Sequence, residues 1–173
     1  MQKVIVIGCP GSGKSTFSRA LHEATKLPLI HLDMLFWNAD RTTVTHEVFD
    51  QRLEKVMDGE CWIIDGNYSR TMELRMAACD TVFFLDYPTE VCLESIRNRR
   101  GKPRPDMPWI EQVDDPDYEE FLAFISNFNY DRRPQVMSLL DKYSEKNIYR
   151  FTSRGQADAF LKTIQEEAQW NLR

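Results

Sequence analysis

The sequence predicts a doubly wound α/β domain, in which helices cover both faces of a five-stranded parallel sheet and form three layers with it. Short runs of β-branched and other apolar residues recur five times along the chain. Amphipathic segments separate these runs, and this alternation is typical of parallel strands joined by crossover helices. The length of 173 residues fits one domain, so we expect residues 1–173 to form a single unit.

The strands are expected where the apolar runs are short and continuous. The first run, KVIVIG, has the pattern of a strand that is buried on both faces. Helical patterns follow the first, second and fourth runs. The expected strands are residues 3–8, 27–33, 61–65, 81–86 and 147–151, and the expected helices include residues 15–26, 46–58 and 88–100.

One long segment interrupts this alternation. Residues 101–117 contain four prolines and many charges, so they can neither continue a helix nor join the sheet. A loop of this length is usually mobile or functional. Apolar side chains then recur at helical spacing over residues 118–143, and Pro134 is expected to kink that helix or to start a second one, because proline lacks an N–H group.

The composition disfavours several classes of protein. The net charge of −5 argues against a sequence-independent grip on nucleic-acid phosphates. Four widely spaced cysteines without a histidine cluster predict reduced thiols rather than a zinc site. The first apolar run begins too early for a signal peptide, and no run is long enough to cross a bilayer. We therefore expect a cytoplasmic protein with no membrane partner.

The stretch GCPGSGKST, residues 8–16, matches the pattern GxxxxGKS between a predicted strand and a predicted helix. Such a loop turns its backbone N–H groups toward phosphates, and the helix adds its positive N-terminal end. The lysine reaches the β- and γ-phosphates, and the serine hydroxyl suits Mg²⁺. The sequence therefore predicts a P-loop NTPase fold that binds ATP and Mg²⁺ through Gly8, Pro10, Gly11, Ser12, Gly13, Lys14, Ser15 and Thr16.

Other features favour phosphoryl transfer over hydrolysis. The guanine-reading NKxD motif of GTPases is missing, and neither Asp65 nor Asp86, at the expected strand ends, precedes the glutamate that activates water in many ATPases. Asp33 and Asp65 are expected at the carboxyl ends of strands, where open α/β sheets bind ligands. One could orient an acceptor hydroxyl and the other could hold Mg²⁺ through water; the alternative is that each caps the following helix.

Arginine and aromatic side chains complete the candidate site. Arg70, Arg99, Arg132 and Arg133 belong to groups of arginines that could converge on the transferred phosphate, or could be solvated surface residues. Phe36 and Trp37 follow Asp33 and could stack on an acceptor base, although packing against the rest of the protein is the simpler interpretation. The histidines are not spaced as metal ligands, and none is assigned a catalytic role.

Together, the P-loop and the segments HLDML, DGNYSRT and DYPTEVCLESIRNRR resemble the adenylate-kinase-like group of small P-loop kinases. Within that group, HLD, WxIDGNYSRT and RPDM are most similar to the DNA topology modulation (FlaR-like) proteins. The resemblance implies an acceptor region at about residues 33–60 with Asp33 and Arg70, Asp65 near the metal, and a lid at about residues 99–120. It places Arg99 at the start of this lid, and it places Arg132 and Arg133 at the second point where the lid meets the rest of the domain.

The sequence also departs from the adenylate-kinase pattern. DGNYSRT is one residue longer than DGFPRT, Ser95 stands where an arginine stacks on adenine, and the lid lacks zinc-binding cysteines. The resulting hypothesis is an ATP-dependent phosphotransferase that acts on a small acceptor, with a nucleotide or nucleoside favoured. The alternative is an ATP-binding regulator that uses ATP as a switch and acts on DNA or a protein; the acidic charge disfavours DNA as a partner.

Overall fold

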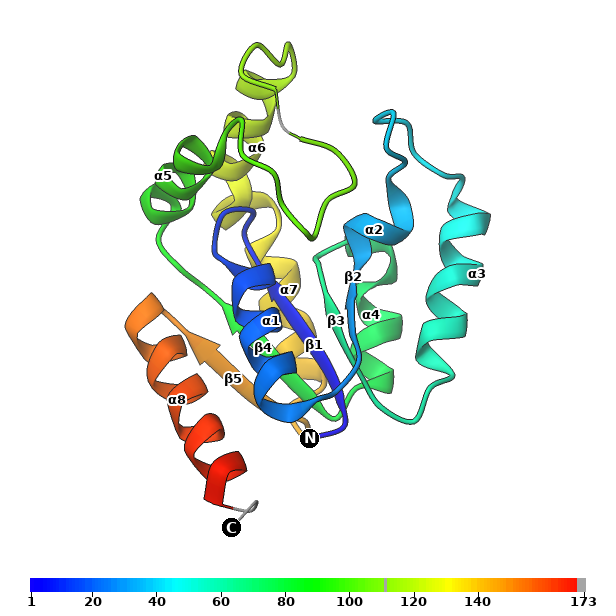
Figure 1. Cartoon of the computed structure of the whole chain (residues 1–173), viewed down its shortest axis with the longest axis vertical. Coiled ribbons are helices and arrows are strands. Elements are labelled where there is room, and N and C mark those ends of the chain that lie inside the picture. Colours follow the sequence, from blue (N-terminus) through cyan, green and yellow to red (C-terminus); the bar gives the residue numbers. More distant parts are fainter. Residues whose placement is uncertain (111, 171–173) are drawn as a thin grey trace.

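The computed structural model describes residues 1–110 and 112–170, and these form a three-layer α/β domain (Figure 1). Its five-stranded sheet has the order β2-β3-β1-β4-β5, and every neighbouring pair is parallel. The strands are β1 Lys3–Gly8, β2 Leu29–His31, β3 Trp62–Asp65, β4 Thr81–Leu85 and β5 Asn147–Phe151. The predicted fold class is confirmed.

The helices cover both faces of this sheet. They are α1 Lys14–Thr25, α2 Leu32–Phe36, α3 His46–Met57, α4 Ser69–Ala78, α5 Thr89–Arg99, α6 Tyr118–Asp131, α7 Arg133–Lys142 and α8 Arg154–Trp170. Side chains of β1 alternate between two cores: Val4 and Val6 pack with α1, α5, α6 and α8, whereas Ile5 and Ile7 pack with α2, α3, α4 and α7. This two-sided burial explains why the strand reads as one apolar run.

Two local details differ from, or refine, the sequence prediction. The second strand is shorter than expected, because the chain turns into α2 after His31. Asp33 therefore lies in the first turn of a short helix. The prediction that Asp33 ends a strand is wrong. Pro134 stands at the start of α7, where its missing N–H costs no hydrogen bond, so the predicted second helix is present.

The strand order places β1 at the centre of the sheet, between β3 and β4. The carboxyl ends of β1, β2, β3 and β4 lie at the same edge, where Gly8 is level with Leu85, and Val6 and His31 are level with Asp65. This edge carries the P-loop and the loop after β3. The fold therefore brings the segments singled out in the sequence to one end of the sheet.

A buried arginine fixes the loop that follows β3. Arg75 of α4 has no exposed surface, and burial lowers the pKa of its guanidinium to about 10. Nη1 donates to Gly66 O at 2.9 Å, and Nη2 donates to Tyr68 O at 3.2 Å and also to Asn67 O. Because three successive carbonyl groups depend on one cation, residues 66–68 have little freedom to move.

We predict that Arg75→Met lowers the free energy of unfolding by roughly 3 kcal/mol, because buried carbonyl groups lose a charged donor. Relief of the desolvation cost of the cation offsets only part of this loss. Urea unfolding measures the difference, and the control is Arg97→Met, which replaces an exposed arginine on α5. Equal stability of the two variants would contradict the role assigned to Arg75.

Candidate active site

The P-loop, residues 8–16, joins β1 to α1 and presents backbone N–H groups to a ligand. No described side chain caps the start of α1, so its first N–H groups remain available. Gly11 has φ 84°, and a Cβ atom there would lie 2.3 Å from the carbonyl oxygen of Cys92. The loop thus packs so closely on α5 that only glycine fits.

Lys14 is the first residue of α1, and its ammonium group folds back over the loop. Nζ donates to Gly8 O at 3.0 Å and to Cys9 O at 3.1 Å. A lysine in this position can exchange these neutral acceptors for the charged oxygens of a bound phosphate. Lys14 thus lies against the backbone of the loop that is predicted to bind phosphate.

The residues predicted to hold Mg²⁺ fit that ion in chemical type. Asp65 is buried, and its Oδ2 lies 2.7 Å from Nδ1 of His31, which orients the carboxylate. Its other oxygen, Oδ1, is buried without a hydrogen-bond partner among the described residues. An oxygen in this position could accept a hydrogen bond from a metal-bound water. Within residues 1–110 and 112–170, no group of three His, Cys, Asp or Glu side chains that could hold a metal ion occurs.

Asp33 points from α2 toward the loop after β3. Its Oδ1 accepts a hydrogen bond of 2.7 Å from the hydroxyl of Tyr68. Burial raises the pKa of Asp33, whereas the hydrogen bond from Tyr68 lowers it. The carboxylate is thus held in a fixed orientation, in a setting where its affinity for protons is enhanced.

Asn67 connects the same loop with the P-loop. Its Nδ2 donates to Gly8 O at 2.5 Å, and its Oδ1 accepts from Gly8 N at 3.0 Å. Gly8 O is also a partner of Lys14, so the carbonyl keeps a donor when the lysine moves to a phosphate. Asn67 therefore fixes the start of the P-loop relative to residues 66–68.

An apolar cavity of about 400 Å³ lies beside these groups. Its walls come from α2 and Trp37, from the loop after β3, and from α4, α6 and α7. The lining residues include Phe36, Trp37, Asn67, Tyr68, Met72, Phe124, Phe128, Arg132 and Val136. The aromatic residues after Asp33 therefore border a cavity, in addition to packing on Phe49 and Trp109. The size and lining suit a small molecule with an apolar ring.

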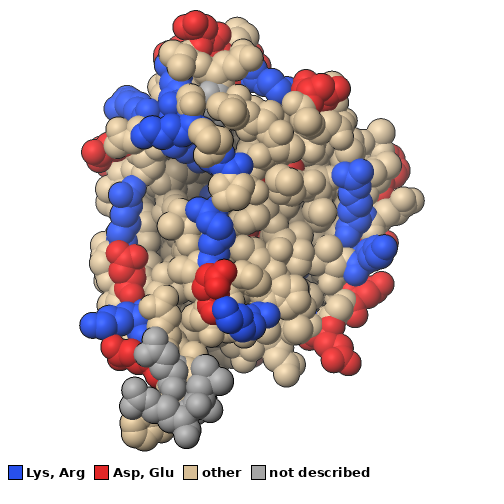
Figure 2. Space-filling view, in the orientation of Figure 1, with Lys and Arg blue, Asp and Glu red and all other residues tan. Residues whose placement is uncertain are grey.

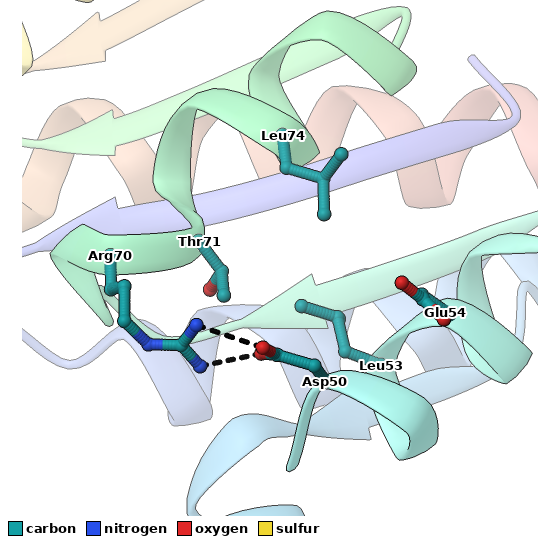
Figure 3. Close-up of a pocket in the computed structure, with 6 residues that line it drawn as sticks. All are labelled: Asp50, Leu53, Glu54, Arg70, Thr71 and Leu74. Atoms are coloured by element: carbon teal, nitrogen blue, oxygen red, sulfur yellow. Dashed lines mark hydrogen bonds and ion pairs between the residues drawn. The ribbon is translucent and has the colours of Figure 1, made fainter. Parts of the chain in front are cut away.

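The predicted arginines do not all reach this cavity. Arg132 lines it, but Arg133 donates to Asp86 at 2.9 and 3.0 Å and ties α7 to the end of β4. Arg70 lies across a smaller groove and donates to Asp50 of α3 at 2.9 Å (Figure 3). The structure thus places Arg132 on the cavity wall and joins Asp33 to the cavity through Tyr68, whereas it holds the side chains of Arg70 and Arg133 in ion pairs elsewhere.

The segment predicted as a lid packs over the P-loop. Asp106 is buried and pairs with Arg104 and, at 3.4 Å, with Arg19 of α1. Burial alone would raise the pKa of Asp106, but hydrogen bonds from Arg104 and Ser15, with the charge of Arg104, lower it to about 2. A carboxylate that is ionised near neutral pH therefore lies next to the predicted Mg²⁺ ligand Ser15.

A second contact joins this segment to the acceptor region. Arg41 lies over the ring of Trp109, 4.7 Å from its centroid, and also pairs with Asp115. The ring of Trp37 packs edge-on against Trp109, with 5.7 Å between the centroids. Arg99 lies at the end of α5, where the segment begins.

Sequence reasoning missed several residues of this site. Five residues that were not predicted contact or border the predicted functional groups: His31, Asn67, Tyr68, Arg104 and Asp106. The extra residue in DGNYSRT was a usable signal for Asn67 and Tyr68, because an insertion beside a ligand-binding strand end must alter the site. The role of His31 depends on its register with Asp65, which the sequence alone does not show.

Comparison with known proteins yields structural likeness only. No family model matches the chain, and no curated protein matches it in sequence. The fold is similar to shikimate kinase from Bacteroides thetaiotaomicron, with a TM-score of 0.55 and 18% identity over 96% of this chain and 97% of that one. It is also similar to shikimate kinase from Acinetobacter baumannii in complex with shikimate, with a TM-score of 0.57 and 17% identity over 99% and 95% of the two chains. The chain therefore has an α/β P-loop NTPase fold similar to that of these two proteins.

Proposed function

We propose that the protein is an ATP-dependent phosphotransferase that acts on a small acceptor, with a nucleotide or nucleoside as the favoured class. One observation carries this proposal: the P-loop and an apolar cavity are joined by the loop of residues 66–68, through Asn67 on one side and Tyr68 on the other. A donor phosphate and an acceptor bound in these two places would be held in fixed relative positions, which is the main requirement for phosphoryl transfer.

The lining of the cavity supports a ring-bearing acceptor. Aromatic side chains offer a flat apolar surface on which a nucleobase can stack. Arg132 on the cavity wall offers one cation for a phosphate or carboxylate, and Asp33, which Tyr68 joins to the cavity, offers an oxygen for the reacting hydroxyl. Shikimate, which the similar kinase from Acinetobacter baumannii binds, is a polyhydroxy acid that is smaller than a nucleoside. It belongs among the acceptors to be tested.

The resemblance to DNA topology modulation proteins remains a prediction from the sequence, and so does the cytoplasmic location.

On the face in Figure 2, basic side chains gather over α5 and the start of the lid segment, while elsewhere they alternate with acidic ones. This arrangement suits a bound polyphosphate better than a long duplex. No helix within the described residues is long and apolar enough to span a membrane.

We predict that Lys14→Ala weakens binding of ATP·Mg by roughly 2–5 kcal/mol, because the P-loop loses the cation aimed at the β- and γ-phosphates. Calorimetry measures the affinity, and thermal unfolding checks that the fold persists. The matched control is Lys162→Ala, which removes an exposed lysine on α8. Unchanged affinity in a folded Lys14→Ala protein would refute the assignment of the P-loop.

Residues 101–117 are predicted to exchange their amide hydrogens more slowly when a bisubstrate analogue is bound, because a kinase must exclude water during transfer. Hydrogen exchange by mass spectrometry measures this protection. Arg41→Ala should reduce the gain, since Arg41 joins the segment to the acceptor region. Protection that is the same with and without the analogue would count against a lid.

The acceptor itself can be identified with labelled ATP and a panel of nucleoside monophosphates, nucleosides, shikimate, sugars and short DNA. We expect a nucleotide or nucleoside to be phosphorylated, and Asp33→Asn to reduce kcat by about 100-fold or more, because the acceptor hydroxyl loses its partner. If the acceptor carries a phosphate, Arg132→Ala should also weaken its binding free energy by roughly 2–5 kcal/mol.

Arg70→Ala serves as the comparison in that experiment. A dependence on Arg70 as strong as that on Arg132 would mean that the pair with Asp50 opens when the acceptor binds. If no panel member is phosphorylated while DNA raises ATP turnover and binds with a steep salt dependence, the kinase proposal fails and the regulator takes its place.

A further inference from the structure

The side chain of Tyr68 links the apolar cavity to Asp33. Its ring lines the cavity near Phe36 and Trp37, while its hydroxyl donates to Asp33 Oδ1 at 2.7 Å. Burial and the charge of Asp33 raise the pKa of Tyr68, so the hydroxyl keeps its proton near neutral pH and acts as the donor. One oxygen of the carboxylate is thereby fixed by a group that also borders the cavity.

Two aromatic contacts hold the ring of Tyr68 in place. It stacks on Phe49 with 5.1 Å between the centroids and an interplanar angle of 24°. Phe36 meets it edge-on, with a centroid separation of 5.3 Å. The hydroxyl therefore cannot leave Asp33 by rotation of the side chain without breaking both contacts.

The backbone of Tyr68 is held in an unusual conformation. Its φ of 38° and ψ of 75° lie in the left-handed region, which bulky residues rarely adopt. Arg75 donates to the carbonyl of Tyr68, as does the backbone N–H of Thr71 at 3.0 Å. Such strain persists only where the surroundings fix the residue, and it is frequent at functional sites.

We propose that Tyr68 is a positioning residue for Asp33: it holds Oδ1, so that Oδ2 is directed at the acceptor hydroxyl. This inference rests on the proposed function, because it assigns the acceptor hydroxyl to Asp33. It also gives the extra residue in DGNYSRT a role, since residues 66–68 place Asn67 on the P-loop and Tyr68 on Asp33.

Several other groups act on Asp33. Its burial raises the pKa of the carboxyl, and so does the charge of Asp65 on β3. The hydrogen bond from Tyr68 lowers this pKa, and the charges of Lys14 on α1 and Arg104 in the lid segment lower it as well. Loss of the hydroxyl should therefore raise the pKa of Asp33 while the other groups stay in place.

The test is Tyr68→Phe in the full chain, because phenylalanine keeps the ring and removes only the hydroxyl. Carbon-13 NMR of aspartate-labelled protein follows the carboxyl of Asp33 with pH, and the signal is identified by its loss in Asp33→Asn. We expect the pKa of Asp33 to rise by roughly one unit in Tyr68→Phe, as for the loss of one hydrogen bond to a charged group. Tyr143→Phe, which removes a hydroxyl near Glu73, should leave it unchanged.

Kinetics with the acceptor found in the panel give a second readout. If ionised Asp33 is required, the acid limb of the pH profile of kcat/KM should move to higher pH in Tyr68→Phe, while KM for ATP stays the same. An active kinase in which Tyr68→Phe changes neither the pKa of Asp33 nor the acid limb would overturn the inference. A wild-type protein that phosphorylates no panel member would instead refute the proposed function, and the NMR titration would still decide whether Tyr68 controls Asp33.

Discussion

The arrangement of the site depends on the hydrogen bonds that Arg75 makes to residues 66–68. These residues lie between β3 and α4, and the carbonyl oxygen of each of the three accepts a hydrogen bond from the same buried guanidinium. The cation also compensates for the strained backbone of Tyr68, whose left-handed conformation costs of order 1–3 kcal/mol. Without this anchor, the loop would relax, and both Asn67 and Tyr68 would lose their partners.

This anchored loop joins the parts of the site that must cooperate. Asn67 holds the backbone of Gly8 through two hydrogen bonds, and Tyr68 holds the carboxylate of Asp33. The proposed donor side and the proposed acceptor side are therefore fixed to the same segment, at the carboxyl edge of the sheet. In phosphoryl transfer most of the catalytic contribution comes from position and electrostatics, so a common anchor has a direct use.

The fold could be predicted from the sequence because the spacing of apolar residues and the residue types at the ends of elements indicated the same strands and helices. The run over β1 and the start of α7 at Pro134 follow from local rules alone. Asp33 was wrongly expected at a strand end, since the edge strand β2 is too short for its pattern to define where it stops. The partners of Arg70 and Arg133 were also beyond local reasoning: which carboxylate an arginine meets depends on packing between α3 and α4, or between α7 and β4.

Two cations of the candidate site, Lys14 and Arg104, are paired within the protein, and these pairs bear on how the proposed ATP·Mg complex would bind. Lys14 donates to two carbonyl groups, and Arg104 pairs with Asp106 beside Ser15. A phosphate can displace a neutral carbonyl from Lys14 at little cost, because its charged oxygens make the stronger bond. Separation of Arg104 from Asp106 would be expensive unless Mg²⁺ or another cation compensates the buried carboxylate. The lid segment should therefore respond to the metal–nucleotide complex rather than to the nucleotide alone, since only the complex brings both the anion and the cation that this pair requires.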